Sequence, residues 1–496
     1  MEILYKSTRG AEKNVTASEA ILKGLASDGG LFVPDQIPAL EESFEELAEC
    51  SYQELAYKVM SKFLTDYTEE ELRYCINSAY DEKFDTKEIA PLQKTKNEYF
   101  LELFHGKTIA FKDMALSILP YLMTTAAKKN NLKEEIVILT ATSGDTGKAA
   151  MAGFADVPGT RIIVFYPKDG VSPVQERQMV TQKGENTCVI AIRGNFDDAQ
   201  TGVKKMFGDE KLKEDLKKAG FQFSSANSIN IGRLVPQVVY YVYAYASLVK
   251  KKEIKAGDKV NFVVPTGNFG NILAAYYAKQ MGLPVNKLIC ASNSNKVLYD
   301  FFSSGSYDKN REFYLTSSPS MDILVSSNLE RLLYRISGES AEITASWMKE
   351  LSEKGVYSIS EEQKKSIADF AAGYSTEEDC AAIIKKIYEE DAYVLDPHTA
   401  VAASVYEKYR TESADATPTV IASTASPYKF ARSVLKAIDE KAYDSHSDDE
   451  QFEDLNKVSK VEIPAAIKEL QEAQIRHKTV VNIEEMQAAV REKLGL

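Results

Sequence analysis

Two kinds of hydrophobic pattern alternate through the middle of the chain. Short runs that are apolar on both faces lie at residues 135–141, 160–166, 187–193, 259–265, 287–293 and 417–423. Segments with helical spacing of apolar positions follow several of these runs, at 146–155, 196–207, 270–281 and 427–438. Strands that helices cover on both faces are apolar throughout, so the runs predict parallel strands. The alternation predicts an open α/β fold with ligands at the carboxyl ends of the strands.

The segments on either side of this alternation have other patterns. Residues 1–90 contain several helical patterns and a Gly-Gly turn in the stretch DGGLFVP, so we expect a helix-rich N-terminal domain over 1–90. Residues 330–392 carry glutamates and lysines in a pattern that predicts a helical insertion with a solvated surface. At 496 residues the chain is too long for one hydrophobic core, and two to four domains or subdomains are expected.

Composition and charge argue against several functional classes. Hydrophobic residues make up 44% and charged residues 27% of the chain, as in ordinary globular enzymes. A formal net charge of −13 argues against a nucleic-acid-binding surface, which needs a basic patch. The five cysteines are scattered without CxxC spacing, and no two of the four histidines lie at metal-ligand spacing. Neither a disulfide framework nor a metal site is therefore expected.

The sequence favours a cytoplasmic protein over a secreted or membrane protein. The N-terminal stretch MEILYKSTRGAEKN lacks the apolar core of a signal peptide. The most apolar segment, residues 234–249, is too short to span a bilayer and contains Pro236 and Gln237. We predict a buried helix there, and the scattered cysteines are typical of a reducing compartment.

A glycine-rich stretch, VPTGNFGNI at 264–272, follows a predicted strand and begins a predicted helix. Gly267 and Gly270 let the backbone approach an anion, and the helix N-terminus offers free N–H donors. A nucleotide-hydrolysing loop would end in a lysine, whereas Asn268 and Asn271 stand here. The stretch predicts a phosphate that is held and not transferred; a simple strand-to-helix turn is the alternative.

A second strand-to-helix turn has the sequence ATSGDTGKAA, at 141–150. Ser143, Gly144, Asp145 and Thr146 offer hydroxyls and backbone amides at a helix start, which suits a substrate carboxylate or phosphate. Simple capping of the helix explains the turn equally well when it is taken alone. Two anion-receptive turns at the strand ends of one fold strengthen the interpretation as a binding site.

Lys112, in the stretch FHGKTIAFKD at 104–113, begins an apolar helical segment. Apolar surroundings and the positive end of a helix lower the pKa of an ammonium group, and the neutral amine condenses with an aldehyde. The alternative is a surface lysine paired with Asp113. The amine, the phosphate turn and a third strand-end turn, STASPYK at 423–429, would together suit pyridoxal phosphate as aldehyde, phosphate and ring nitrogen.

An ordered set of motifs gives the chain a specific resemblance. The motifs are YKSTRG (5–10), GLASDGGLFVP (24–34), HGKTIAFKD (105–113), ATSGDTG (141–147), NSIN (227–230) with Arg233 and Gln237 after it, PTGNFGN (265–271) and STASPYKF (423–430). In these residues the sequence resembles the threonine synthase family, of the longer bacterial and fungal type. That family lies within the tryptophan-synthase-β-like group of pyridoxal-phosphate enzymes, and the resemblance extends over most of the chain.

The resemblance implies a particular division of the chain. The fold would contain two open, mostly parallel sheets flanked by helices, after the helix-rich region at 1–90. Residues 91–440 would form the catalytic region, made of two α/β subdomains and containing the insertion at about 330–392. Residues 441–496 would form a C-terminal helical extension.

The same resemblance implies a set of site residues. Lys112 would form the Schiff base with pyridoxal 5′-phosphate, and Thr424 would hydrogen-bond the ring nitrogen. A hydroxyl at that position makes the ring a weaker electron sink than a carboxylate would. The residues implied to hold the cofactor phosphate are Gly267, Asn268, Phe269, Gly270 and Asn271. Those implied to line the substrate pocket are Ser143, Thr146, Asn227, Ser228 and Arg233.

Two of these positions leave alternatives open. Arg233 is the candidate for a bidentate clamp on an anionic group, and a structural salt bridge is the alternative. The family usually has the segment TAHP, whereas this chain has Ser426 in place of the histidine. Ser426 is therefore a second candidate for the partner of the ring nitrogen.

The resemblance implies conversion of O-phospho-L-homoserine and water into L-threonine and phosphate, the last step of threonine biosynthesis. Lys112 would act as the base that removes the α-proton. A phospholyase acting on phosphoserine-like or phosphothreonine-like substrates is the nearest alternative, and a non-catalytic small-molecule-binding relative is the other. We expect the protein to bind a small-molecule substrate. We do not expect it to bind nucleic acid, a membrane, a metal or an obligate protein partner.

Overall fold

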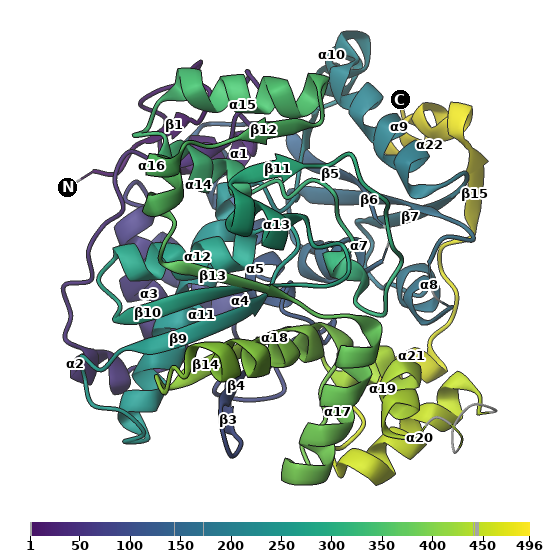
Figure 1. Ribbon diagram of the computed structural model, residues 1–496. Helices are drawn as coiled ribbons and strands as arrows, with labels where there is room; N and C mark the ends of the chain where they lie inside the picture. The colour runs from purple at the N-terminus through teal and green to yellow at the C-terminus, as the bar shows by residue number, and fades with distance from the viewer. Residues whose placement is uncertain (1, 143, 172, 440, 442–445) are drawn as a thin grey trace.

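Two sheets of mainly parallel strands form the body of the molecule (Figure 1). The structure is a computed structural model that describes residues 2–142, 144–171, 173–439, 441 and 446–496. Helices flank both sheets, and the N-terminal region is rich in helices. The predicted fold class, with two open and mostly parallel sheets, is confirmed.

The smaller sheet has five parallel strands in the order β15-β7-β6-β5-β8. These strands are β5 (Glu135–Ala141), β6 (Thr160–Pro167), β7 (Thr187–Arg193), β8 (Phe221–Ser224) and β15 (Thr479–Asn482). Around them lie α7 (Asp145–Phe154), α8 (Pro173–Val180), α9 (Phe196–Gly208), α10 (Glu210–Lys218) and α22 (Met486–Leu494). Val137 and Leu139 of β5 pack on one side with α9 and α22, whereas Ile136 and Ile138 join the main core on the other. Burial on both faces explains the unbroken apolar runs.

The larger sheet has six strands in the order β13-β10-β9-β14-β4-β3, parallel except for the β3–β4 pair. Its strands are β3 (Leu92–Lys94), β4 (Tyr99–Glu102), β9 (Val260–Pro265), β10 (Val285–Ser292), β13 (Phe370–Tyr374) and β14 (Thr419–Ser423). The helices near it are α11 (Ile231–Lys250), α12 (Gly270–Gln280), α13 (Val297–Ser304), α17 (Glu377–Asp391), α18 (Pro397–Ser413) and α19 (Ala431–Ile438). Helix α18 packs against β9, β10, β13 and β14 and so covers one face of this sheet.

The N-terminal helices each begin with the same local device. They are α1 (Ala17–Lys23), α2 (Phe44–Ala48), α3 (Tyr52–Phe63) and α4 (Glu69–Ala79), after and between the paired strands β1 (Tyr5–Ser7) and β2 (Phe32–Pro34). A Ser or Thr precedes each helix and accepts the N–H of a glutamate three residues on, whose carboxylate accepts the cap N–H in return. Such capping boxes satisfy backbone donors locally, so these boundaries follow from the sequence.

An ion pair joins the N-terminal motif to a distant helix. Arg9 donates to both carboxylate oxygens of Glu330, from Nε at 2.9 Å and from Nη2 at 2.8 Å. Thr8 donates to the same carboxylate at 2.6 Å. Glu330 belongs to α14 (Leu329–Ile336), so the STRG motif holds the N-terminal region against the middle of the chain.

The stretches at 330–392 and 441–496 are not purely helical, which corrects the expectation. Besides α14, α15 (Ala341–Glu353), α16 (Glu361–Ser366) and α17, the first contains β12 (Val356–Ser358) and β13. Strand β12 pairs with β11 (Ser306–Asp308), and β13 forms an edge of the six-stranded sheet. The second contains β15 among α20 (Asp448–Ser459), α21 (Ala465–Glu472), η3 (Ile483–Glu485) and α22. Both edge strands are short and partly exposed, so they lack a continuous apolar run.

The most apolar segment of the sequence lies inside α11, as predicted. Nearly all of its side chains are buried, including Pro236 and Gln237. The helix packs against α2, α3 and α12 and forms a core element between the N-terminal region and the larger sheet. In the described part of the chain, no helix is long and apolar enough to cross a membrane.

Candidate active site

Lys112 is a buried amine at the start of α5 (Asp113–Leu116), with its side chain 10% exposed. Its Nζ donates to Ser320 Oγ at 2.9 Å and lies 3.6 Å from Asp145 Oδ2. Burial lowers the pKa of Lys112 to about 8, and the cations of Lys429 and Arg233 act in the same direction against the attraction of Asp145. An amine with this pKa is partly neutral near pH 7 to 8, as condensation with an aldehyde requires.

The alternative of a surface lysine paired with Asp113 is wrong. Asp113 is itself buried and begins α5. Its carboxylate accepts the Thr108 N–H and the Thr108 hydroxyl, both at 2.7 Å. Asp113 therefore fixes the loop before Lys112 and leaves the amine free to face other groups.

A buried ion pair lies beside Lys112 and was not foreseen from the sequence. Asp145 Oδ1 is 3.2 Å from Lys429 Nζ, and the two side chains are 5% and 1% exposed. Lys429 also donates to the Thr108 carbonyl at 2.9 Å. Burial opposes ionisation of Asp145, but the ammonium groups of Lys429 and Lys112 outweigh it and hold the pKa of this carboxyl well below its usual range. The carboxylate thus lies between two amines from distant parts of the chain.

A serine held by a histidine contacts the amine from another side. Ser320 belongs to the short helix η1 (Pro319–Met321), and its N–H donates to His398 Nε2 at 3.2 Å. Since Nε2 accepts, the histidine proton lies on Nδ1, which is 2.9 Å from Asp396 Oδ1. Asp396 caps α18 by accepting the N–H groups of His398 and Thr399. The capped helix start therefore fixes His398, which in turn fixes Ser320 beside Lys112.

The turn from β9 to α12 presents a row of unused amides. Within the described chain, the N–H groups of residues 267–271 donate to no protein acceptor. Phe269 has a left-handed backbone with φ 65°, and its ring packs in the core against Phe302 and Phe370. A Cβ at Gly267 would lie 2.5 Å from the Ser320 carbonyl oxygen. These amides at a helix N-terminus match a phosphate, and Ser320 places them next to Lys112.

The side chains of this turn have structural roles. Asn271 donates to the Pro265 carbonyl at 2.9 Å, and Asn268 is exposed and accepts a hydrogen bond from Ser327 at 3.4 Å. Gly270 begins α12. The turn can therefore bind an anion with its backbone, while its side chains hold the backbone in place.

The second turn, after β5, is only partly described, because Ser143 lies outside the described residues. Thr142 Oγ1 accepts the N–H groups of Gly144 and Gly147, each at 3.0 Å, so Thr142 stabilises the start of α7. Gly144 has φ 144°, which favours glycine. Thr146 is half-buried in the first turn of α7, and its hydroxyl makes no hydrogen bond to a described residue.

Arg233 is a buried cation without an ion pair in the described part of the chain. It is 4% exposed, donates from Nη1 to the Ala226 carbonyl at 3.1 Å, and has no partner at Nε. Burial lowers its pKa to about 10. The alternative of a structural salt bridge is therefore wrong. A guanidinium buried without a counter-ion is costly unless an anion binds it, so this group is poised for an anionic ligand.

Asn227 and Ser228 lie on the loop between β8 and α11, the helix that carries Arg233. Asn227 is exposed and Ser228 is half-buried. The Asn227 carbonyl accepts the Asn230 N–H at 3.1 Å, and Asn230 caps α11. The loop therefore leads directly into the helix turn that holds Arg233.

Thr424 follows β14 and reaches the loop that carries Lys112. Its carbonyl accepts the Phe111 N–H at 2.8 Å, and it is 4% exposed. Its hydroxyl makes no hydrogen bond to a described residue, which leaves it available to a ligand. Ser426 Oγ accepts the Tyr428 N–H at 3.3 Å and so caps η2 (Pro427–Phe430). This role favours Thr424 over Ser426 as the ligand-facing hydroxyl.

An aldehyde-bearing phosphate ester would find every partner it needs here. The carboxyl ends of β5, β9 and β14 supply Asp145, the amide turn and Thr424, and Lys112 lies among them. The residues present thus match pyridoxal 5′-phosphate. Among the described residues no cluster of His, Cys, Asp or Glu could hold a metal ion.

The sequence did not predict the roles of four residues in this site. They are Asp145 as an ionic partner, Ser320, His398 and Lys429. The stretch DPHT at 396–399 did carry a readable signal, a capping Asp followed by Pro at the first helical position. Lys429 lay inside the quoted STASPYKF motif. Ser320 had no local signal, because its role depends on a loop folding over Lys112.

Comparisons with known proteins agree with this geometry. Residues 4–80 match the family described as threonine synthase N terminus, 88–424 that described as pyridoxal-phosphate dependent enzyme, and 399–492 that described as threonine synthase, C-terminal. A threonine synthase of Schizosaccharomyces pombe is 38% identical over 88% of this chain and 90% of its own length.

Solved structures give the same result at the level of the fold. The structure of a threonine synthase with bound pyridoxal phosphate from Brucella melitensis has a TM-score of 0.87 and 36% identity, and covers 99% of both chains. A yeast threonine synthase structure has a TM-score of 0.89 and 34% identity, and covers 100% of this chain and 99% of its own. Both similarities span nearly the whole chain.

Proposed function

The chain belongs to the threonine synthase family, and we propose that it uses the site around Lys112 to convert O-phospho-L-homoserine and water into L-threonine and phosphate. The observation that carries the proposal is a buried, partly neutral amine lying between an unpaired amide turn and an unpaired buried arginine. The first two match a phosphorylated aldehyde cofactor, and the arginine matches an anionic substrate.

Lys112, the backbone of Gly267–Asn271 and the hydroxyl of Thr424 are the groups that would hold pyridoxal 5′-phosphate. When bound, this cofactor supplies an electron sink that acidifies C–H bonds of an attached amino acid. The protein contributes a hydroxyl and not a carboxylate at Thr424, which limits how strongly a ring nitrogen can be protonated. With Thr424 as its partner, the cofactor ring would therefore be a weaker electron sink than with a carboxylate.

Lys112 Nζ is the atom placed to take the α-proton of the substrate and return it. Its pKa of about 8 lies near neutrality, where a general base is most effective. Ser320 and Asp145 both contact the amine, so they fix its position and help to hold a proton on it. His398 contributes indirectly, because it holds the Ser320 backbone.

Arg233 would bind an anionic group of the substrate, its phosphate or its carboxylate, with two parallel hydrogen bonds. Ser143, Thr146, Asn227 and Ser228 would complete the pocket with hydroxyl and amide groups. If Arg233 binds the phosphate, a substrate with only a hydroxyl in that position would leave the Arg233 cation without a counter-ion. This assignment would favour a phosphorylated substrate over serine or threonine, whose carboxylate is their only anionic group.

Product analysis tests the reaction against its alternatives. The purified enzyme loaded with cofactor should release equimolar phosphate and L-threonine from O-phospho-L-homoserine. A phospholyase would instead release phosphate with a keto acid and ammonia, and faster from O-phospho-L-threonine. A Lys112→Ala variant that keeps full activity would refute the role of the amine, and a chain that never binds the cofactor would support the non-catalytic alternative.

We further propose that the enzyme acts in the cytoplasm on a small-molecule substrate. The five cysteines form no disulfide, as expected in a reducing compartment. Cell fractionation would test this location, and recovery of the native enzyme with a membrane or an exported fraction would contradict it.

A further inference from the structure

One buried arginine contacts both anion-receptive parts of the candidate site. Arg331 lies on α14, and its side chain is fully buried. Its Nε donates to the Phe32 carbonyl at 2.9 Å and its Nη2 to the Ile229 carbonyl at 2.6 Å, while its Nη1 donates to Asn328 Oδ1. A single guanidinium therefore joins strand β2, the loop between β8 and α11, and the residue that precedes α14.

The contact with Asn328 acts on the amide turn between β9 and α12. Asn328 donates to the Asn268 carbonyl from its backbone N–H and from Nδ2, each at 3.0 Å, and Ser326 Oγ donates to the Gly267 carbonyl at 2.6 Å. A turn can present its N–H groups to an anion only when its carbonyls point elsewhere and are satisfied. Because a guanidinium can only donate, Arg331 holds Oδ1 of Asn328 toward itself and so directs Nδ2 to the turn.

The contact with Ile229 acts on the loop that leads to Arg233. Ile229 lies between Ser228, proposed to line the substrate pocket, and Asn230, which caps α11. The Asn230 carbonyl accepts the Arg233 N–H at 2.9 Å. The hydrogen bond from Arg331 to the Ile229 carbonyl therefore fixes the loop at the point where it becomes the helix turn of Arg233.

Arg331 differs from Arg233 in how its donors are used. All three nitrogens of the Arg331 guanidinium donate to described residues, whereas Nε of Arg233 has no partner there. The acceptors of Arg331 are two carbonyls and an amide, because the carboxylate of the adjacent Glu330 accepts from Arg9 and Thr8. Hydrogen bonds from a charged donor are stronger than those from a neutral donor. Arg331 is therefore suited to hold protein segments in place, and Arg233 to meet a ligand.

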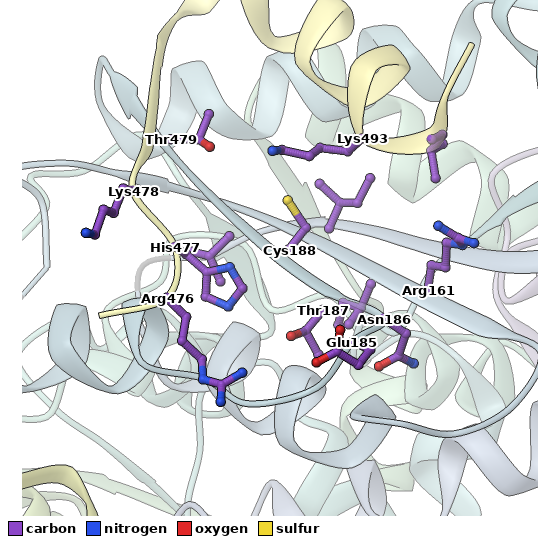
Figure 2. A pocket seen from close by; sticks show the side chains of 14 residues that line it. Arg161, Glu185, Asn186, Thr187, Cys188, Arg476, His477, Lys478, Thr479 and Lys493 are labelled. Carbon is purple, nitrogen blue, oxygen red and sulfur yellow. The ribbon is translucent and has the colours of Figure 1, made fainter. Parts of the chain in front are cut away.

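Cations elsewhere in the molecule are placed differently. At the amino ends of β6 and β7, Arg161, Arg476 and Lys478 point away from one another (Figure 2). Arg161 is paired with Glu135 at 2.9 Å, and the other two side chains are exposed. Exposed cations fix the protein only weakly, since water screens their interactions. Full burial with acceptors on three separate segments sets Arg331 apart from this group.

We propose that Arg331 is a positioning residue that holds the cofactor-phosphate turn and the substrate loop in a fixed relation to each other. It acts on the turn through Asn328 and on the loop through the Ile229 carbonyl. The inference rests on the proposed function, which takes the turn as the site of the cofactor phosphate and the loop as part of the substrate pocket. Since displacements of about 1 Å can cost about 100-fold in rate, such a link between two binding elements matters for turnover.

Matched lysine variants test whether Arg331 affects both ligands. Lysine keeps the charge but lacks the planar fork that reaches three acceptors. In Arg331→Lys, the dissociation constant of pyridoxal phosphate and the KM for O-phospho-L-homoserine should each rise roughly tenfold or more, with a smaller change in kcat. Arg335→Lys is the control, because Arg335 lies one turn later on α14 and donates to the Pro34 carbonyl of the same strand β2 at 2.9 Å. It should change neither constant.

A second variant separates the two contacts. Asn328→Leu keeps the branched shape of the side chain but removes the Nδ2 donor, so it should weaken cofactor binding and leave KM at saturating cofactor unchanged. In this background Arg331→Lys should weaken cofactor binding by less than about twofold more, because its effect on the turn runs through Asn328. It should still raise KM through Ile229. Additive losses of cofactor affinity, or an unchanged KM in Arg331→Lys, overturn the proposal.

The phosphorus NMR resonance of the bound cofactor is a readout that a loss of stability alone would not move. At full occupancy and below the melting temperature, the resonance should shift in Arg331→Lys and in Asn328→Leu but not in Arg335→Lys. An unmoved resonance would mean that Arg331 only stabilises the fold, which overturns the proposal. If Arg331→Lys does not fold, Asn328→Leu alone decides, and wild-type cofactor affinity in that variant overturns it.

These readouts also keep the inference separate from the proposed reaction. A wild-type enzyme that binds the cofactor but forms no threonine from O-phospho-L-homoserine would refute the proposed function. Cofactor affinity and the phosphorus resonance would still decide the contact through Asn328. A wild-type enzyme that forms threonine, with variants that match it in both ligand affinities, would instead refute the role of Arg331 alone.

Discussion

Replacing Asp145 with asparagine would remove a buried charge from between two amines while leaving the shape of the side chain. Asp145 Oδ1 lies 3.2 Å from Lys429 Nζ, and both side chains are almost wholly buried. At an effective dielectric constant of about 20, two unit charges at that distance attract by about 5 kcal/mol. Loss of one partner leaves Lys429 buried and unpaired, so we expect Asp145→Asn to destabilise the protein by about 3–5 kcal/mol.

Thermal unfolding of matched variants measures this effect. For a chain of 496 residues a loss of that size corresponds to a fall in melting temperature of about 3–5 °C. The Lys429→Met variant should show a comparable fall, because it leaves the carboxylate of Asp145 with only Lys112 as a cationic partner. The double variant Asp145→Asn/Lys429→Met should lose less than the sum, by about 1–3 kcal/mol, since both charges are then absent.

A surface ion pair serves as the control. Arg73 and Glu69 lie 2.7 Å apart, one helical turn apart, with side chains 46% and 62% exposed. Glu69→Gln should cost no more than about 0.5 kcal/mol. If Asp145→Asn is no more destabilising than this control, or if the two buried variants are strictly additive, the buried pair does not hold the site together and the reasoning fails.

Four further outcomes follow from the site and its surroundings. Arg233→Met should lower kcat/KM for O-phospho-L-homoserine roughly 10- to 100-fold without lowering the melting temperature, because the guanidinium has no ion pair to lose; the opposite pattern would mark a structural role. Gly267→Ala places a Cβ 2.5 Å from the Ser320 carbonyl oxygen, so the variant should lose cofactor on dialysis, as judged by its visible absorbance. If the variant retained as much cofactor as the wild type, the turn would not be the binding site of the cofactor phosphate. The rate should rise with pH through about 8, the pKa of Lys112, and a flat profile there would contradict its role as a base. His105 lies between Asp85 and Glu102, and these acids outweigh burial and raise its pKa from 6.5 to about 9. Its contribution to stability is therefore full below about pH 6.5 and lost as the pH rises through about 9. In the His105→Gln variant, the free energy of unfolding measured with urea should no longer fall between these pH values, and an unchanged fall would contradict this role of His105.

The local elements of this protein could be predicted from its sequence with good accuracy. Strands β5 and β7 have the predicted bounds, and the helix at 196–207 ends within one residue of α9. Burial of both strand faces requires an unbroken apolar run, and an amphipathic helix requires apolar residues on one face. Both patterns can therefore be read directly from the amino-acid sequence. The short strands β13 and β15 were not predicted, because edge strands need neither pattern.

The candidate site divides in the same way. Lys112 and the amide turn at 267–271 could be proposed as candidates from the sequence, because they begin a helix or follow a strand, and such ends leave backbone groups or side chains free to bind ligands. Thr424 was singled out only by the family resemblance. The local pattern also left Arg233 as either a clamp or a salt bridge. Only the structure, which buries Arg233 without a counter-ion among the described residues, excluded the salt bridge.

Tertiary structure alone decided which residues surround the amine. Asp145 comes from the smaller sheet, whereas Lys429 and Ser320 belong to segments around the larger sheet, and they meet because the chain crosses between the two sheets. Hydrophobic spacing reports only on neighbours within a few residues along a strand or helix. The environment that lowers the pKa of Lys112 is instead made of distant charges and excluded water, and these exist only when the sheets have come together.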